Sequence, residues 1–246
     1  LANPTVPLSW LIGFGLIGAI FWSSLLGGTR KRFWTIFASV FFGTMALIKS
    51  LDLINWFLHP RLGPIVVTLI SVGIAYGITQ LSIGIANKQA LKASLTMSAL
   101  TLLFYYPVNW IFKQSMNIWI LLAMLIFTIA LATGVAISYS KIDRGPIIRT
   151  TILTAVLSAL IVLVDKFMYT WSPYMQTDAI NYRPVPTIGQ RNDLLDSTDF
   201  WITHLDTILH LFLPTIALTL ISFAGYVRFS RGTLLEVLNQ DYNLKY

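Results

Sequence analysis

Two histidines lie among several aspartates in the last third of the chain, and metal binding is the chemistry that these residue types could perform. His204 and His210 are close in sequence to Asp199 and Asp206. A protein metal site needs three or four ligands that converge. The two histidines are spaced so that they do not share one face of a helix, and no tight ligand pair stands out. We therefore predict no metal site here and favour an interfacial segment that leads into an apolar span.

Other catalytic patterns are missing from the sequence. Nothing matches the phosphate-binding pattern G-x-x-x-x-G-K-[ST]. No Ser/His/Asp arrangement is convincing, and the chain has 0 cysteines, which removes disulfides, thiolate metal sites and cysteine nucleophiles. We predict no catalytic residue, no cofactor bound by this chain and no ATP hydrolysis by it, so the chain is not expected to be an enzyme.

A glycine pattern near the N-terminus has two interpretations. Residues 13–18 read G-x-G-x-x-G, which in another context marks a dinucleotide-binding turn. Here the pattern lies within an apolar run and has no strand before it. Small residues instead recur every four positions, at Gly15, Ala19, Ser23 and Gly27. Such a stripe lets two helices approach closely in lipid, so we predict that it packs against another helix.

One adjacent pair of charges, Asp165 and Lys166, stands at the end of an apolar run. An ionisable residue inside a membrane is by default a candidate for ion coupling. Tyr169, Trp171 and Tyr174 follow directly and suit an aromatic belt at the membrane surface. We favour side chains that reach out to water over a role in ion coupling.

The composition decides which elements must position these residues. Of the 246 residues, 56% are hydrophobic and 11% are charged, and the mean hydropathy is +0.71. Soluble domains carry roughly a quarter charged residues, so most of this surface must face lipid. The net charge of +7 is placed between the apolar runs, which indicates membrane topology and argues against nucleic-acid binding.

Apolar runs near twenty residues long are the length that crosses a bilayer, and they predict an all-α polytopic bundle of about seven spans. The predicted spans are 8–28, 33–48, 62–86, 93–112, 118–138, 147–164 and 208–227. The short apolar stretch 53–58 is predicted to lie at the interface or to extend the second helix. The alternation places 11 of the 17 basic residues on one side, which predicts a cytoplasmic C-terminus and a long external segment over 165–207.

The C-terminal stretch joins a membrane span to an amphipathic helix. Arg228 and Arg231 end the last span and are predicted to anchor it at the inner surface. Beyond them, Leu234 and Leu238 share one helical face, while Glu236 and Asp241 lie elsewhere. The helix either lies along the membrane surface or transmits force from a cytoplasmic partner.

The stretch HLFLPTIALTLISFAGYVRFSRGTLLEVLNQDY, residues 210–242, strongly resembles the permease subunits of dipeptide, oligopeptide and nickel ABC transporters. In that family a helix beginning H-L-x-L-P ends in R-x-(S/T)-R and is followed by (M/L)-L-E-V-L-N-Q-D-Y. Residues 183–189 also look like an external loop of some members, and 118–166 resembles the two preceding family helices more loosely. The resemblance implies that the coupling loop and two further helices would follow Tyr246.

The resemblance implies a division of labour among several chains. The expected partners are a second permease subunit, cytoplasmic ATPase subunits that hold ATP and magnesium, and an extracytoplasmic peptide-binding protein, in the plasma (inner) membrane. The resemblance also implies that the ATPase contact begins near Leu235, Glu236, Asp241 and Tyr242. The chain then divides into a part of unknown role, 1–116, and a partial permease domain, 117–246, whose coupling region starts at about 229.

Three other hypotheses remain open at this point. A secondary transporter would couple transport to an ion, although the centres of the predicted spans hold no Asp, Glu, Lys or Arg. A membrane scaffold would bind another membrane protein without moving a substrate. A truncated remnant of a permease would not transport at all.

Overall fold

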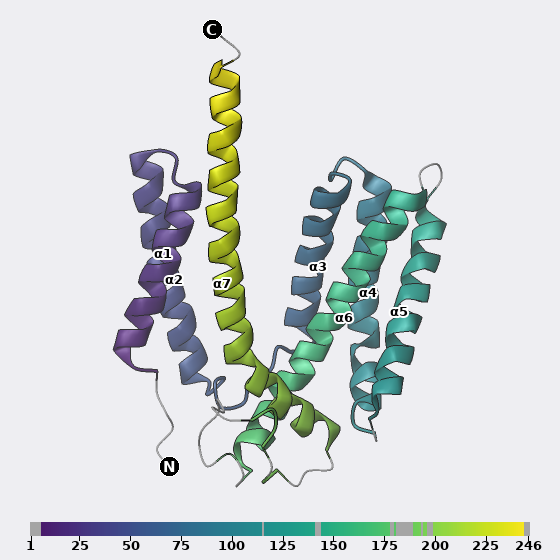
Figure 1. Ribbon diagram of the computed structural model, residues 1–246. Helices are drawn as coiled ribbons and strands as arrows, with labels where there is room; N and C mark the ends of the chain where they lie inside the picture. The colour runs from purple at the N-terminus through teal and green to yellow at the C-terminus, as the bar shows by residue number, and fades with distance from the viewer. Residues whose placement is uncertain are drawn as a thin grey trace.

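The computed structural model describes residues 6–114, 116–140, 144–177, 180, 189–192, 194–195 and 199–243, with side chains described up to residue 238. These residues form seven α-helices and no strand (Figure 1). The helices are α1 (Leu8–Leu26), α2 (Arg30–Leu53), α3 (Gly63–Ser82), α4 (Lys88–Ile111), α5 (Ile118–Tyr139), α6 (Arg144–Met175) and α7 (Phe200–Asn243). The predicted all-α class is confirmed.

Six of the seven helices described are long and apolar enough to cross a membrane: α1, α2, α3, α5, α6 and α7. The fold therefore fits a multi-pass membrane protein. Helix α4, predicted as a span, does not meet the same measure, because Gln89, Lys92 and a series of hydroxyl residues dilute its apolar content. It packs against α3, α5 and α6, so its polar groups have neighbouring helices beside them.

Helices α1 and α2 form a hairpin in which the small-residue stripe is the contact surface. Leu11, Gly15, Ala19 and Ser23 are the buried residues of α1. A Cβ placed on Gly15 would lie 3.1 Å from the Phe41 ring and 3.4 Å from Met45. Gly27 lies as closely against Phe33. The stripe thus lies against α2, and a larger side chain at Gly15 would push α2 away.

Helices α3, α4, α5 and α6 pack as a bundle whose interior carries hydroxyl groups. The Ser98 hydroxyl on α4 donates to the Ser71 carbonyl on α3 at 2.9 Å. At the end of α3, the Ser82 hydroxyl lies 2.9 Å from the Thr150 hydroxyl of α6. Small hydroxyl residues suit helix contacts in lipid, since they allow close approach and bond across helices. The bundle takes helices from both predicted parts of the chain, 1–116 and 117–246.

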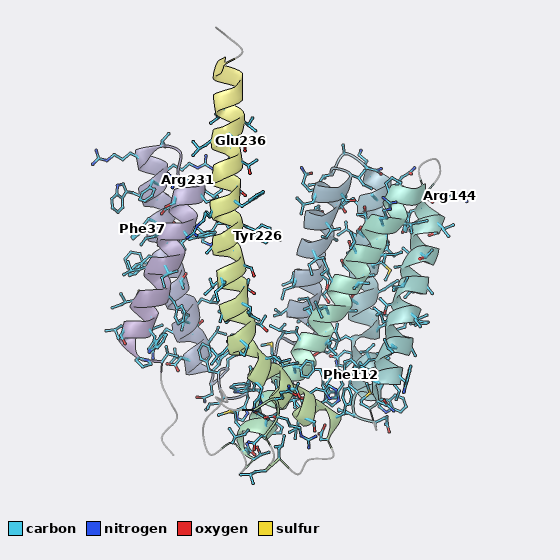
Figure 2. The ribbon with its side chains drawn as sticks, viewed as in Figure 1. Phe37, Phe112, Arg144, Tyr226, Arg231 and Glu236 are labelled. Atoms are coloured by element: carbon cyan, nitrogen blue, oxygen red, sulfur yellow. The ribbon has the colours of Figure 1, made fainter. Side chains whose placement is uncertain are left out.

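The connections alternate between two ends of the structure (Figure 1). Helices α1, α3 and α5 end, and α2, α4 and α6 begin, at the end toward which α7 extends, here called the inner end; α1, α3 and α5 begin, and α2 and α4 end, at the opposite end, here called the outer end. Arg144 and Arg231 are labelled at the inner end and Phe112 at the outer end (Figure 2). This alternation agrees with the side assignment made from the basic residues.

Several predicted helix boundaries differ from the structure. Helix α6 continues to Met175 and α7 begins at Phe200, so both ends of the predicted external segment 165–207 are helical. Helix α2 is longer than its predicted span and ends at Leu53, where turns replace helix over 54–58. Asn55 in this turn has a φ of 54°, a conformation that does not continue a helix.

Replacing Gly15 with valine is expected to destabilise the α1–α2 hairpin. Overpacking a close contact costs about 1–3 kcal/mol, and the Phe41 ring already lies against this position. Gly13 is the matched control, because a Cβ there meets nothing within 4 Å. Thermal unfolding in detergent should show a lower midpoint for Gly15→Val than for Gly13→Val. Equal midpoints would contradict close packing at Gly15.

Candidate functional site

The outer end of the bundle contains a buried carboxylate on α6. Asp165 is 4% exposed, and one oxygen accepts from the backbone amides of Leu62 at 2.6 Å and Gly63 at 3.3 Å. These amides begin α3 and have no partner within their own helix. The other oxygen accepts from the Tyr105 hydroxyl of α4 at 2.6 Å. A single side chain therefore joins three helices.

The expectation that Asp165 reaches out to water is wrong. Helix α6 continues beyond it to Met175, and the start of α3 lies directly against it. A carboxylate at a helix N-terminus is stabilised by the helix dipole, and the three donors compensate its removal from water. Its neighbour Lys166 is half-buried, with Nζ 5.3 Å from the centre of the Tyr169 ring and 5.5 Å from that of Trp201.

A second buried carboxylate holds the base of α7. Asp206 is 0% exposed. It accepts from the Tyr174 hydroxyl of α6 at 2.9 Å and from the backbone amide of Asn192 at 2.9 Å. The ring Nδ1 of His210 lies 3.5 Å from the same carboxylate and 2.8 Å from the Asp206 carbonyl. The base of α7, helix α6 and the segment before α7 therefore meet at one side chain.

Trp201 makes a third connection at this end. Its indole N–H donates to the Phe112 carbonyl, just after α4, at 3.0 Å. Its ring packs edge-on against Phe112 and Phe167, with centroids 4.9 and 5.4 Å away. The indole buries a large apolar area and satisfies a carbonyl that α4 leaves unbonded at its end.

The two histidines lie in different surroundings. His204 is exposed, and its ring lies against Phe200 with centroids 3.9 Å apart. His210 is buried beside Asp206. Within the parts of the chain that the structure describes, no group of three or more His, Cys, Asp or Glu side chains converges. The arrangement at Asp206 is thus a hydrogen-bonded network between helices.

The predicted anchors and part of the predicted coupling region lie on the inner half of α7. Arg228, Arg231, Leu235 and Glu236 are all exposed on this helix. Figure 2 places Arg231 near the level at which α1 ends and Glu236 beyond it. Asp241 and Tyr242 belong to α7, but their side chains lie outside the described ones. Of the resembling loop 183–189, only Gly189 is described.

Sequence reasoning missed the two carboxylate networks. The spacing of Asp206 and His210, four residues apart on one helix face, was a usable signal, as was Tyr174 on the preceding helix. The contact of Asp165 with α3 joins residues far apart in the chain, and no local pattern marks it.

Fold and site together define an all-helical protein that is compatible with a multi-pass membrane protein and whose helices are joined at one end by buried carboxylates. No protein-family model, no curated protein and no solved structure matches the chain.

Replacing Asp165 with leucine is expected to destabilise the bundle strongly. The change leaves three donors, the amides of Leu62 and Gly63 and the Tyr105 hydroxyl, without their acceptor. A buried group left unsatisfied costs about 1–3 kcal/mol. Glu236→Leu is the matched control, because Glu236 is exposed. Thermal unfolding in detergent should show a large fall in midpoint for Asp165→Leu alone; similar midpoints would contradict the role of Asp165.

Replacing Tyr174 with phenylalanine is expected to loosen the base of α7. It removes the hydroxyl that donates to Asp206 and leaves the ring in place, at a cost of about 1–2 kcal/mol. Tyr169→Phe is the control, since Tyr169 is exposed. Asp206 also accepts a hydrogen bond from the backbone amide of Asn192. Hydrogen exchange at this amide should become faster in Tyr174→Phe but not in Tyr169→Phe. An unchanged exchange rate would show that Tyr174 does not support this network.

Proposed function

We propose that the chain is a membrane-spanning permease subunit of an ABC importer that moves peptides across the plasma membrane. The observation that carries the proposal is the course of the last helix. Residues 210–242, which bear the resemblance to such permeases, lie within one continuous helix, α7. Figure 1 shows this helix extending past the inner ends of the other helices.

This course suits a helix that meets a cytoplasmic partner. Arg228 and Arg231 are exposed on α7, Arg231 lies near the level of the inner ends of the other helices (Figure 2), and arginines favour the cytoplasmic side. Glu236 lies beyond them and carries a charge that an ATPase subunit could pair with. Leu235 and Arg231 also line a shallow groove on α7 together with Tyr226.

The proposal assigns the chemistry of ATP to other chains. ATP and magnesium would be held by the cytoplasmic ATPase subunits, and an extracytoplasmic peptide-binding protein would deliver the substrate. A second permease subunit would complete the translocation path. Every residue from Leu211 to Leu238 is exposed on α7, so this helix offers a long surface to lipid or to a neighbouring membrane subunit.

A secondary transporter is the second candidate, and the buried carboxylates favour it. Asp165 and Asp206 are buried acids in helices long and apolar enough to cross a membrane, and ion-coupled transporters use acids placed within the membrane. It ranks lower because the protein already satisfies both groups, through Leu62, Gly63 and Tyr105 in one case and Tyr174 and Asn192 in the other.

Peptide uptake with a disabled ATPase separates these functions. The chain is produced together with the ATPase subunits and a second permease subunit of a peptide ABC importer, and uptake of a labelled tripeptide is measured in vesicles that contain ATP. Replacing the phosphate-binding lysine of the ATPase should abolish uptake, while an ionophore that collapses proton and sodium gradients should leave it unchanged. Uptake that survives the ATPase variant and stops with the ionophore would establish the secondary transporter instead.

Reversing the charge at Glu236 tests the partner contact. Glu236→Arg is expected to lower uptake about tenfold, because a repulsive charge costs more than about 1 kcal/mol in a protein contact. Lys88→Glu, a charge reversal at the inner start of α4, is the control and should leave uptake near wild type. Equal uptake by the two variants would remove Glu236 from the contact.

A further inference from the structure

Helix α7 consists of two stretches with opposite surroundings. Its first stretch, Phe200–His210, holds the buried residues Trp201, Leu205, Asp206 and His210. From Leu211 to Leu238, every residue is exposed. The helix is thus fastened at its outer end and unattached along the remainder that the structure describes.

The fastening of the first stretch, here called the foot, uses several independent contacts. Asp206 binds Tyr174 of α6 and the Asn192 amide, and Trp201 binds the Phe112 carbonyl. Leu205 packs in a buried cluster with Tyr174 and Ile180. Contacts on α6, on the end of α4 and on the segment before α7 therefore fix both the position and the direction of the foot.

The second stretch, here called the arm, has no comparable contacts. Among the described helices, α6 is the only one against which α7 packs to any extent, and the buried residues of α7 all lie in the foot. Figure 1 shows the foot running obliquely below the bundle and the arm rising from it as a straight helix. The direction of the arm thus depends on the helix backbone near the end of the foot.

The backbone hydrogen bonding of α7 is interrupted where the two stretches meet. Pro214 lies inside α7, four residues after His210, the last buried residue. A proline has no N–H, so the carbonyl of His210 lacks its usual helical partner, and the ring also pushes that carbonyl aside. Helices bend preferentially at such positions.

We propose that α7 is a lever with a fixed foot, Phe200–His210, and a bending point at Pro214 about which the arm swings. From Pro214 to the end of α7 at Asn243, the helix is about 44 Å long at 1.5 Å per residue, so a change of about 10° at Pro214 moves its tip by about 8 Å. The use of this motion to transmit force from an ATPase rests on the proposed function; the motion itself does not.

Distances between spin labels test the lever in the whole chain. The sequence contains 0 cysteines, so pairs of cysteines can be introduced and labelled without other changes. One pair, Ser230→Cys with Leu81→Cys, joins the arm to the inner end of α3, and both positions are exposed. A second pair, Ile208→Cys with Tyr106→Cys, joins the foot to α4 at exposed positions. Double electron–electron resonance spectroscopy on the chain in lipid nanodiscs gives the distribution of distances for each pair.

The lever predicts a broad distribution for the arm pair and a narrow one for the foot pair. Pro214→Ala restores the N–H and should narrow the arm distribution about twofold while leaving the foot pair unchanged. Pro107→Ala is the matched control, because Pro107 also lies inside a helix, α4, and is exposed. It should change neither distribution.

Two results would overturn the proposal. A narrow arm distribution in the wild-type chain, or one that Pro214→Ala leaves unchanged, would show that Pro214 is not a bending point. A foot distribution as broad as that of the arm would show that the foot is not fixed. Neither measurement uses an ATPase or a peptide, so failure of the proposed transport function would leave the distances unaffected and would be seen only in the uptake assay.

Discussion

The carboxylate of Asp165 is the constraint on which the arrangement of the bundle depends. In lipid, each buried polar group must find its partner inside the protein. The first amides of α3 have no partner in their own helix, and the Asp165 carboxylate is withdrawn from solvent. The amides therefore donate their hydrogen bonds to this carboxylate. This contact fixes α3 against α6 at one end, and the Thr150–Ser82 contact follows near the other end of α3. With Tyr105 bound to the same carboxylate, α4 is fixed as well.

The seven helices were predictable because lipid demands apolar runs of a set length, and each predicted span lies within or close to a helix. The Gly15 to Gly27 stripe was predictable for a similar reason, since only small residues permit the close approach seen at Phe41. The end of α6 was not predictable from the sequence. A buried, satisfied aspartate and an exposed one look alike in sequence, so Asp165 beside Lys166 suggested a membrane surface where the helix in fact continues.

The polar networks of the site escaped prediction because they join distant parts of the chain. Tyr105 and Asp165 lie on α4 and α6, and Trp201 reaches the carbonyl of Phe112. Periodicity reveals which face of a helix is apolar, but not which neighbour that face meets. The predicted span 208–227 on α7 shows the same limit, because its apolar sequence predicts a membrane helix but Leu211 to Val227 are all exposed, so no neighbour can be assigned to it.

The distribution of contacts determines which parts of the chain can move independently. Helices α3, α4 and α6 are joined by hydroxyl and carboxylate hydrogen bonds at several levels, whereas α1 and α2 pack chiefly on each other and α7 packs on α6. Regions with few buried contacts open at low free-energy cost. A displacement of Glu236 is transmitted along the chain to the bundle through the foot of α7. There, Asp206 contacts Tyr174 of α6 and Trp201 contacts the carbonyl of Phe112 at the end of α4, so a movement of the foot acts on these two helices. The polar groups that fasten the outer end are therefore also the connection between the inner surface and the bundle.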